Sequence, residues 1–259
     1  MSQNGNGAKV SENYDADDPA TFGVVREPVN GVFCLREIDW ADLELTGSLD
    51  LSDCVNLEKL DVSKNKITSL KVDGCSALKE IDASENELTD FSPISLESAT
   101  KIDVSFNKLE YFFVAWVYEL EELRCVQNSL KTLNFYSLRS LKTFVCGNNP
   151  ELTEIGWRTD DSYESLERLE CWNTGLKTLD LSAFAKLTYL ACYGDEMRSV
   201  YVPDVCEGGT VDISKLKIDL TRYKTEIKPE EVEDKEDGAK VYPNEESYYS
   251  TVNRRETGV

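Results

Sequence analysis

Eight cysteines and the complete lack of histidine limit the chemistry that this chain can perform. Histidine is the commonest general base and metal ligand, so catalysis of the Ser-His or Cys-His type is excluded. The sequence also lacks a Gly-rich phosphate loop, a GxSxG segment and an HExxH segment. Its 49 acidic residues offer many carboxylate pairs, but nothing marks two of them as an acid and a base. We therefore expect a chain that is not an enzyme and needs no cofactor.

Six of the cysteines recur at regular spacing, in two sets: Cys54 with Cys75, and Cys125, Cys146, Cys171 with Cys192. Such spacing predicts two lines of inward-facing thiols along a stack of repeats, where cysteine acts as a small apolar residue. Disulfides between adjacent thiols stay open as an alternative, because neighbouring strands lie within bridging distance. Four sulfurs in a straight line cannot converge on a tetrahedron, so we expect no metal site.

A third regular set, Asp61, Asp82 and Asp103, places carboxylates one above another on the outside of the stack. A cation could bridge them, but lysines lie alongside and no EF-hand or RTX spacing supports calcium. A solvated acidic face is the better interpretation. The net charge of −21 extends this conclusion to the whole chain, because binding to phosphate backbones or anionic membranes depends on Lys and Arg. We expect no nucleic-acid partner and no membrane insertion.

The element that positions these residues is a repeat of 21 residues with the pattern LxxLxVxxNxLxxLxV. Clear copies begin at Leu57, Leu78, Ala99, Leu120, Leu141, Leu166 and Leu187, and a degenerate copy around Ile38 to Leu51 precedes them. The copy at Leu141 is longer, and its extra length at 158–163 predicts a loop on one face of the stack. We use the word column for the equivalent positions of successive copies. The first inward column runs Leu60, Ile81, Ile102, Leu123, Phe144, Leu169, Leu190.

One further column is polar and holds asparagine. Its members are Asn65, Asn86, Asn107, Asn128 and either Asn148 or Asn149, of which Asn149 is preferred. An asparagine side chain both donates and accepts, so a buried ladder of them can satisfy backbone groups where each coil turns. Thr174 and Asp195 interrupt this structural ladder, which predicts looser turns in the last two copies.

Alternation within LxV predicts a strand, and one coil can bury its apolar side only by stacking on its neighbours. The pattern therefore predicts a β-rich leucine-rich-repeat solenoid of about eight coils and on the order of 35 Å in length. Parallel strands form its concave face. Because 21 residues are too few for a helix, the convex face holds short extended segments such as 67–72, with few or no helices.

The repeat resembles the bacterial 21-residue leucine-rich repeats, with cysteine in some columns, of surface proteins from Bacteroidetes and spirochaetes. The resemblance covers residues 36–202, and it implies adhesion or protein binding at the cell surface or outside the cell. The chain itself begins without the apolar segment of a signal peptide, so a cytoplasmic location stays open.

The ends of the chain differ from the repeats. Residues 1–20 have the composition of a disordered leader or linker, and 21–56 form an N-terminal cap with the degenerate repeat. The solenoid occupies 57–203. Residues 204–259 are expected to be a C-terminal cap or small β appendage with an acidic loop.

Outward positions change along the solenoid. Early copies are expected to expose Lys, Glu, Asp and Ser, including Ser63, Ser84 and Ser105, whereas later copies expose an apolar patch of Phe106, Val126, Val145, Trp172, Tyr189 and Tyr193. Such patches usually mark interaction sites, and Trp and Tyr are frequent hot spots. A covering by the C-terminal segment or the 158–163 loop is the structural alternative.

These features favour a binding scaffold whose concave sheet contacts a protein, or alternatively a glycan. A possible second role is a passive spacer or assembly module within a larger surface protein.

Overall fold

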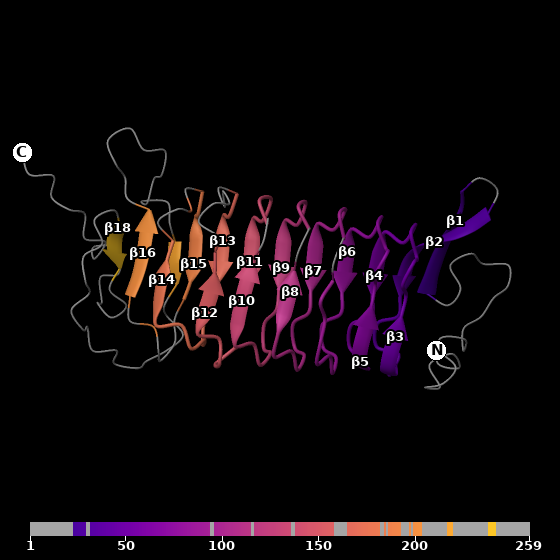
Figure 1. Ribbon diagram of the computed structural model, residues 1–259, viewed down its shortest axis with the longest axis horizontal. Coiled ribbons are helices and arrows are strands. Elements are labelled where there is room, and N and C mark those ends of the chain that lie inside the picture. The colour runs from indigo at the N-terminus through magenta and orange to yellow at the C-terminus, as the bar shows by residue number, and fades with distance from the viewer. Residues whose placement is uncertain are drawn as a thin grey trace, which may run out of the picture.

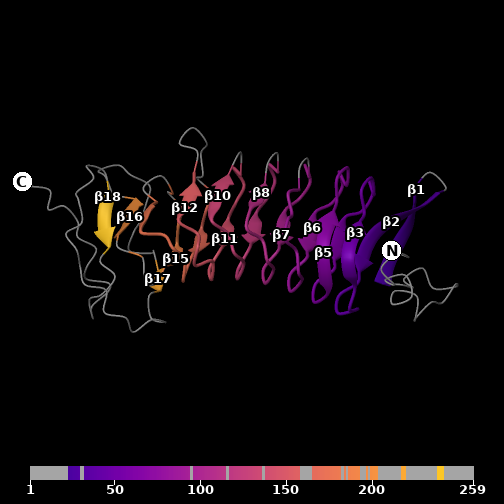
Figure 2. The same ribbon diagram turned by 60° about the horizontal axis from the view of Figure 1, so that its bottom comes forward.

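The computed structural model describes residues 23–29, 32–93, 96–114, 117–135, 138–157, 165–181, 184, 186–192, 197, 199–203, 217–219 and 238–241. All regular elements in these ranges are β-strands, and they lie in two layers along an elongated rod (Figures 1 and 2). This part of the chain has no helix long and apolar enough to cross a membrane. The predicted leader at 1–20, the 158–163 loop and Tyr193 lie outside the described residues.

One layer is a ten-stranded sheet, and we call its outer surface the long-sheet face; it corresponds to the face predicted to be concave. Its strands, in order across the sheet, are β1 (Val24–Val29), β2 (Val32–Asp39), β4 (Lys59–Asp61), β6 (Glu80–Asp82), β7 (Lys101–Asp103), β9 (Glu122–Arg124), β11 (Thr143–Val145), β13 (Arg168–Glu170), β15 (Tyr189–Ala191) and β17 (Lys217–Asp219). Strands β2 to β17 pair in parallel, and β1 forms an antiparallel hairpin with β2.

The second layer consists of shorter sheets on the opposite side, and we call its outer surface the short-sheet face (Figure 1). One holds β3 (Thr46–Asp50) and β5 (Lys66–Lys71), the next holds β8 (Phe112–Val114), β10 (Thr132–Phe135) and β12 (Glu154–Gly156), and the last holds β14 (Thr178–Asp180), β16 (Ser199–Pro203) and β18 (Gly238–Val241). The extended back segments expected from the short repeat are therefore confirmed.

The core lies between the two layers, and the register of the long sheet aligns its columns. Leu60 pairs with Ile81, Ile81 with Ile102, and Ile102 with Leu123, and the same column continues to Leu190. All of these side chains are buried. Burying one such side chain contributes about 1.5–3 kcal/mol, but only because the next turn covers it.

The side chains of the asparagine column form hydrogen bonds between each turn and the one before it. Asn107 donates from Nδ2 to the Ala83 carbonyl at 3.0 Å, and its Oδ1 accepts from the Leu88 N–H at 2.9 Å. Asn149, and not Asn148, occupies the ladder, with the same two kinds of bond. At the next position of the column, the Thr174 hydroxyl donates to the Cys171 carbonyl at 3.0 Å, in place of the several bonds that an asparagine makes. The ladder thus satisfies backbone groups that neighbouring strands cannot reach.

Candidate binding surface

The first turns present a charged long-sheet face whose serines are folded inward. Asp61 accepts the Ser63 N–H at 2.9 Å, and Asp103 accepts the Ser105 N–H at the same distance. Ser63 and Ser105 are only 7% and 4% exposed, so the expectation that they are exposed was wrong. These serines are buried because the backbone turns after each aspartate and brings the serine N–H to its carboxylate. The Ser105 hydroxyl also accepts a hydrogen bond from the Val126 N–H of the next turn. Desolvation raises the pKa of Asp103, because partial burial of its carboxylate disfavours the charged form.

The middle of the face holds two internal ion pairs. Arg124 pairs with Glu122 on β9, and Arg168 donates from Nε to Glu170 on β13 at 2.6 Å. Val145 on β11 pairs with Arg124 on one side and Glu170 on the other, and it is 1% exposed. Its two longer neighbours leave it no accessible surface, so the prediction that Val145 is a contact residue was wrong.

Trp172 lies across the backbone of the preceding turn. A Cβ added to Gly147 would stand 2.3 Å from the indole Cδ2, so the ring occupies the space that a side chain at 147 would fill. The strand register continues from Val126 through Gly147 to Trp172, and both Val126 and Trp172 are partly exposed. Gly147 therefore lets the indole approach along one column of the face.

Among the members of the predicted patch that the structure describes, Phe106 is the most exposed, at 46%. Its φ of 58° lies in the left-handed region, where a bulky residue is strained by about 1 kcal/mol or more. Polar residues hold the same left-handed position in the other described turns: Lys64, Glu85, Gln127, Asn148 and Asn173. Phe106 donates its N–H to the Val126 carbonyl at 2.7 Å, so the two residues are neighbours. We call Phe106, Val126 and Trp172 the apolar strip.

Tyr189 belongs to a different part of the face. The Arg168 guanidinium lies 3.9 Å from the centroid of its ring, a cation–π stack between paired residues. Arg168 and Trp172 are four residues apart along the chain, which separates their columns by at most about 13 Å, and Glu170 lies between them. The predicted patch is thus divided into the apolar strip and a stacked Arg168–Tyr189 pair, with charged residues between them. Tyr189 was chosen from its aromatic type, whereas its arginine partner was missed.

The predicted thiol line is present in the interior. Cys125, Cys146, Cys171 and Cys192 are buried free thiols in one column, and burial raises the pKa of each, that of Cys192 to about 12. Cys75 is also buried, with its pKa raised to about 11 by desolvation. A thiol that stays protonated is a poor nucleophile and a poor metal ligand. Within the described residues, no group of three or more His, Cys, Asp or Glu side chains could hold a metal ion.

A family model described as Leucine Rich Repeat matches residues 56–78, the first clear copy of the repeat. The same columns recur in the later turns of the aligned parallel sheet. The repeats that the structure describes therefore form a leucine-rich-repeat solenoid.

Among solved structures, the solenoid is similar to the functional domain of InlJ from Listeria monocytogenes, whose description notes a cysteine ladder. The sequence identity is 24% and the TM-score is 0.42, and the match covers 68% of this chain. It spans 49% of that chain, about half its length. No curated protein sequence matches this leucine-rich-repeat chain significantly.

Proposed function

We propose that this leucine-rich-repeat solenoid is a protein-binding scaffold whose apolar strip forms the centre of the contact surface. The observation that carries the proposal is Phe106, an exposed aromatic ring held in a left-handed conformation that polar residues occupy in the other turns. Backbone strain of this kind is usually retained where function requires it. Since the other described turns place polar residues at this position, the repeat itself does not require phenylalanine there.

The surroundings of the strip support a protein partner. Large aromatic side chains anchor most interfaces. Val126 lies next to Phe106, and the indole of Trp172 covers Gly147, so only Val126 and Gly147 lie between the two aromatic residues. Next to them, Gln127, Asn148 and Asn173 offer amides, and Asn173 already donates to Asn148 at 2.9 Å. An apolar centre with a polar rim is the usual anatomy of an interface. The strands hold these side chains in place before contact, which lowers the ordering cost of binding.

The finer parts of the proposal concern biology. We propose an adhesin or surface interaction module of a bacterium, located at the cell surface or outside the cell, with a repeat of the 21-residue class described above. The net charge of −21 favours a partner with a neutral or basic surface. A passive spacer in a larger surface protein is the alternative, and it differs in making no use of the strip.

The decisive variant is Phe106→Asn, because asparagine tolerates the left-handed region and should leave the turn as stable or more stable. If the strip binds a partner, capture of proteins by the immobilised chain falls at least about tenfold although stability does not. Lys64→Asn, at the equivalent position two turns earlier, is the matched control. Capture would be followed by mass spectrometry and the affinity by biolayer interferometry.

A second variant tests the same surface without changing an exposed residue. Gly147→Ala places a methyl group where the indole of Trp172 lies, so the ring has to swing away. We expect altered tryptophan fluorescence and weakened capture. Undiminished capture by both Phe106→Asn and Gly147→Ala would contradict the proposal and favour the spacer.

A further inference from the structure

The short-sheet face is interrupted between β5 and β8. The intervening segment is joined to β5 by one isolated bridge, Ser69 to Asp90, and to β8 by another, Phe91 to Phe112. Pro93 follows and has no backbone N–H to donate, so pairing cannot extend along this segment. The back layer therefore has a local gap, whereas the front layer continues through the same turns.

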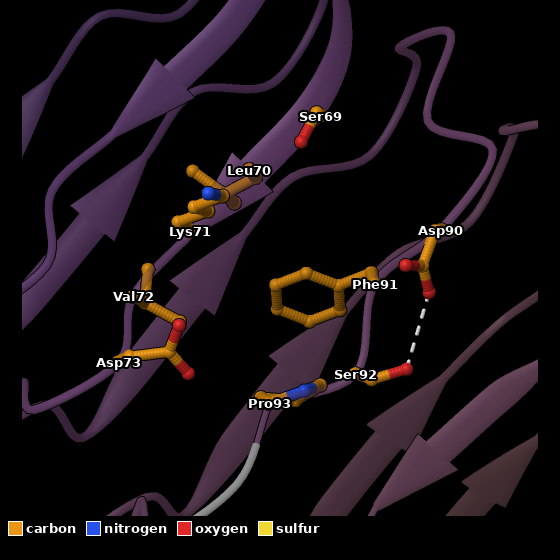
Figure 3. Close-up of a pocket in the computed structure, with 9 residues that line it drawn as sticks. All are labelled: Ser69, Leu70, Lys71, Val72, Asp73, Asp90, Phe91, Ser92 and Pro93. Atoms are coloured by element: carbon orange, nitrogen blue, oxygen red, sulfur yellow. Dashed lines mark hydrogen bonds between the residues drawn. The ribbon is translucent and has the colours of Figure 1, made fainter.

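A cavity of about 180 Å³ opens at this gap (Figure 3). Phe91, Pro93 and the side chains of Leu70 and Val72 supply its apolar part. Its polar groups come from side chains of three kinds, hydroxyl, carboxylate and ammonium: Ser69, Ser92, Asp73, Asp90 and Lys71. Asp90 accepts a hydrogen bond from the Ser92 hydroxyl at 3.2 Å, as Figure 3 shows, so both side chains lie at one rim.

Two exposed aromatic residues lie directly beside this rim. The bridge between Phe91 and Phe112 aligns Tyr111 with Asp90 and Phe113 with Ser92 on the outer surface. Phe112 points inward, and its ring stacks on that of Phe91 with 6.1 Å between the ring centroids. Because side chains alternate along β8, the two neighbours of Phe112 point outward. Tyr111 is 62% exposed and Phe113 is 42% exposed. Burial in the core therefore does not account for either ring.

The charges at the gap are mixed, and this narrows the class of ligand. Asp73 and Asp90 disfavour an anion, whereas Lys71 disfavours a cation. The Lys131 ammonium, 5.7 Å from the centroid of the Tyr111 ring, is paired with Glu110, so this neighbouring pair adds no net charge. A neutral molecule with many hydroxyl groups can bond to carboxylate, ammonium and hydroxyl groups at once. The apolar C–H face of such a ring can also pack on an aromatic side chain.

The size of the cavity points the same way. Pockets for drug-sized ligands usually measure about 300–1,000 Å³, so this one accepts a single small ring. We propose that the gap between β5 and β8 is a binding site for a neutral saccharide. One sugar unit sits among Lys71, Asp90 and Ser92, and an adjoining unit stacks on Tyr111 and Phe113. This site is on the opposite layer from the apolar strip and does not depend on it.

Saturation-transfer-difference NMR on the full chain tests the site. The probes are glucose, galactose, mannose and N-acetylglucosamine, with cellobiose, lactose and chitobiose as disaccharides. We expect saturable binding of at least one probe, with a Kd of about 1 mM and stronger binding of the disaccharide than of its monosaccharide. Tyr111→Ala, Phe113→Ala and Asp90→Asn should each weaken it at least about tenfold.

Two controls separate the site from other aromatic surfaces. Tyr118→Ala removes a ring of equal exposure to Phe113, 42%, outside the register of the cavity, and Phe106→Asn alters the opposite face. Both should bind the sugar like the parent chain. All four aromatic positions are exposed, and circular dichroism verifies that each variant folds.

Lack of saturable binding by every probe would overturn the proposal, as would binding that survives both Tyr111→Ala and Phe113→Ala. Loss of protein capture in these two variants, without any sugar binding in the parent, would also overturn it and assign the surface to a protein contact.

Discussion

The first and the last turns of the long sheet solve the same packing problem with different outer surfaces. Turns from Leu57 to 119 repeat Lys or Glu, then Asp, at the outward positions of their strands, and the charge at the first of these positions alternates from turn to turn. Turns from Leu120 onward replace these with Arg124, Val145, Trp172 and Tyr189. Both sets keep one unbroken parallel ladder. The stack therefore constrains the inward columns, and the outward ones are free to specialise.

The interiors also differ, in one column. The slot two residues after the first inward column holds Val62, Ala83 and Val104 in the early turns, and cysteine in the later ones. Valine and cysteine are both small and apolar, so the fold accepts either. Only the thiol can ionise, however, so the later turns become sensitive to alkaline pH. The early part of the stack shares this sensitivity through Cys54 and Cys75, where desolvation also raises the pKa of the thiol.

The largest expected effect is a loss of stability at alkaline pH, centred on the later turns. Unfolded thiols ionise near their ordinary pKa of 9.0, but burial raises the pKa of Cys125, Cys146, Cys171 and Cys192 in the folded chain. Above pH 9.0 the folded state then binds more protons than the unfolded state. The thiols therefore cost no stability below about pH 9.0, and the free energy of unfolding falls as the pH rises above it. One pH unit above 9.0, each thiol costs on the order of 1 kcal/mol of stability. Urea midpoints at about pH 8 and about pH 10 measure the loss.

A valine variant supplies the control. Cys125→Val with Cys146→Val copies the residue found at Val62 and Val104 in the same column. It should remove about half of the loss attributed to the four thiols, because two of the four no longer titrate. An alkaline loss as large as in the parent chain would show that other groups are responsible.

The second effect in size concerns the asparagine ladder, which is complete in the early turns and weaker in the later ones. Asn128→Ala leaves the Leu109 N–H without its side-chain partner and removes one of the two asparagine donors to the Val104 carbonyl, which keeps its bond from Asn107. A buried group without a partner costs about 1–3 kcal/mol, and the lost bond to the Val104 carbonyl adds about 1 kcal/mol, so we expect a loss of about 2–4 kcal/mol. Thr174→Val removes one bond, to the Cys171 carbonyl, and should cost about 1 kcal/mol. Equal losses in urea unfolding would contradict this difference between the two regions.

The repeated parts of the molecule could be predicted because their causes are periodic. The inward column from Leu60 to Leu190 and the asparagines follow from a spacing that only stacking explains, and the back strands follow from the shortness of each repeat. The same logic indicated that Thr174 would weaken the ladder.

The binding surface could be predicted only in part, because outward positions interact with neighbours in other turns. The sequence pattern predicts that Val145 is exposed. It is buried because the longer side chains of Arg124 and Glu170 flank it, on the strands to either side. The outward aromatics on the opposite face had a signal in the sequence, since Phe112 falls at an apolar position of the repeat and period-two alternation then exposes Tyr111 and Phe113. The gap near Pro93 had none, since a single proline does not reveal which pairing it interrupts.

The smallest effect is expected from the surface ion pairs that link successive early turns. Lys108 and Glu87 lie 2.8 Å apart on neighbouring turns, and both are well exposed, so solvent and salt screen their attraction. Lys108 holds the pKa of Glu87 below its ordinary value, so the contribution is present at neutral pH and is lost as the carboxylate is protonated in acid.

A double-mutant cycle of Glu87→Gln and Lys108→Met, followed by urea unfolding at low and high salt, measures this coupling directly. We expect a favourable coupling smaller than either preceding effect, which disappears when salt is added. A coupling that persists in high salt would mean that the pair is shielded from solvent. The early turns would then owe their regular charge pattern to stability, and the contrast with the later turns would lie in what holds each region together as well as in what each presents to a partner.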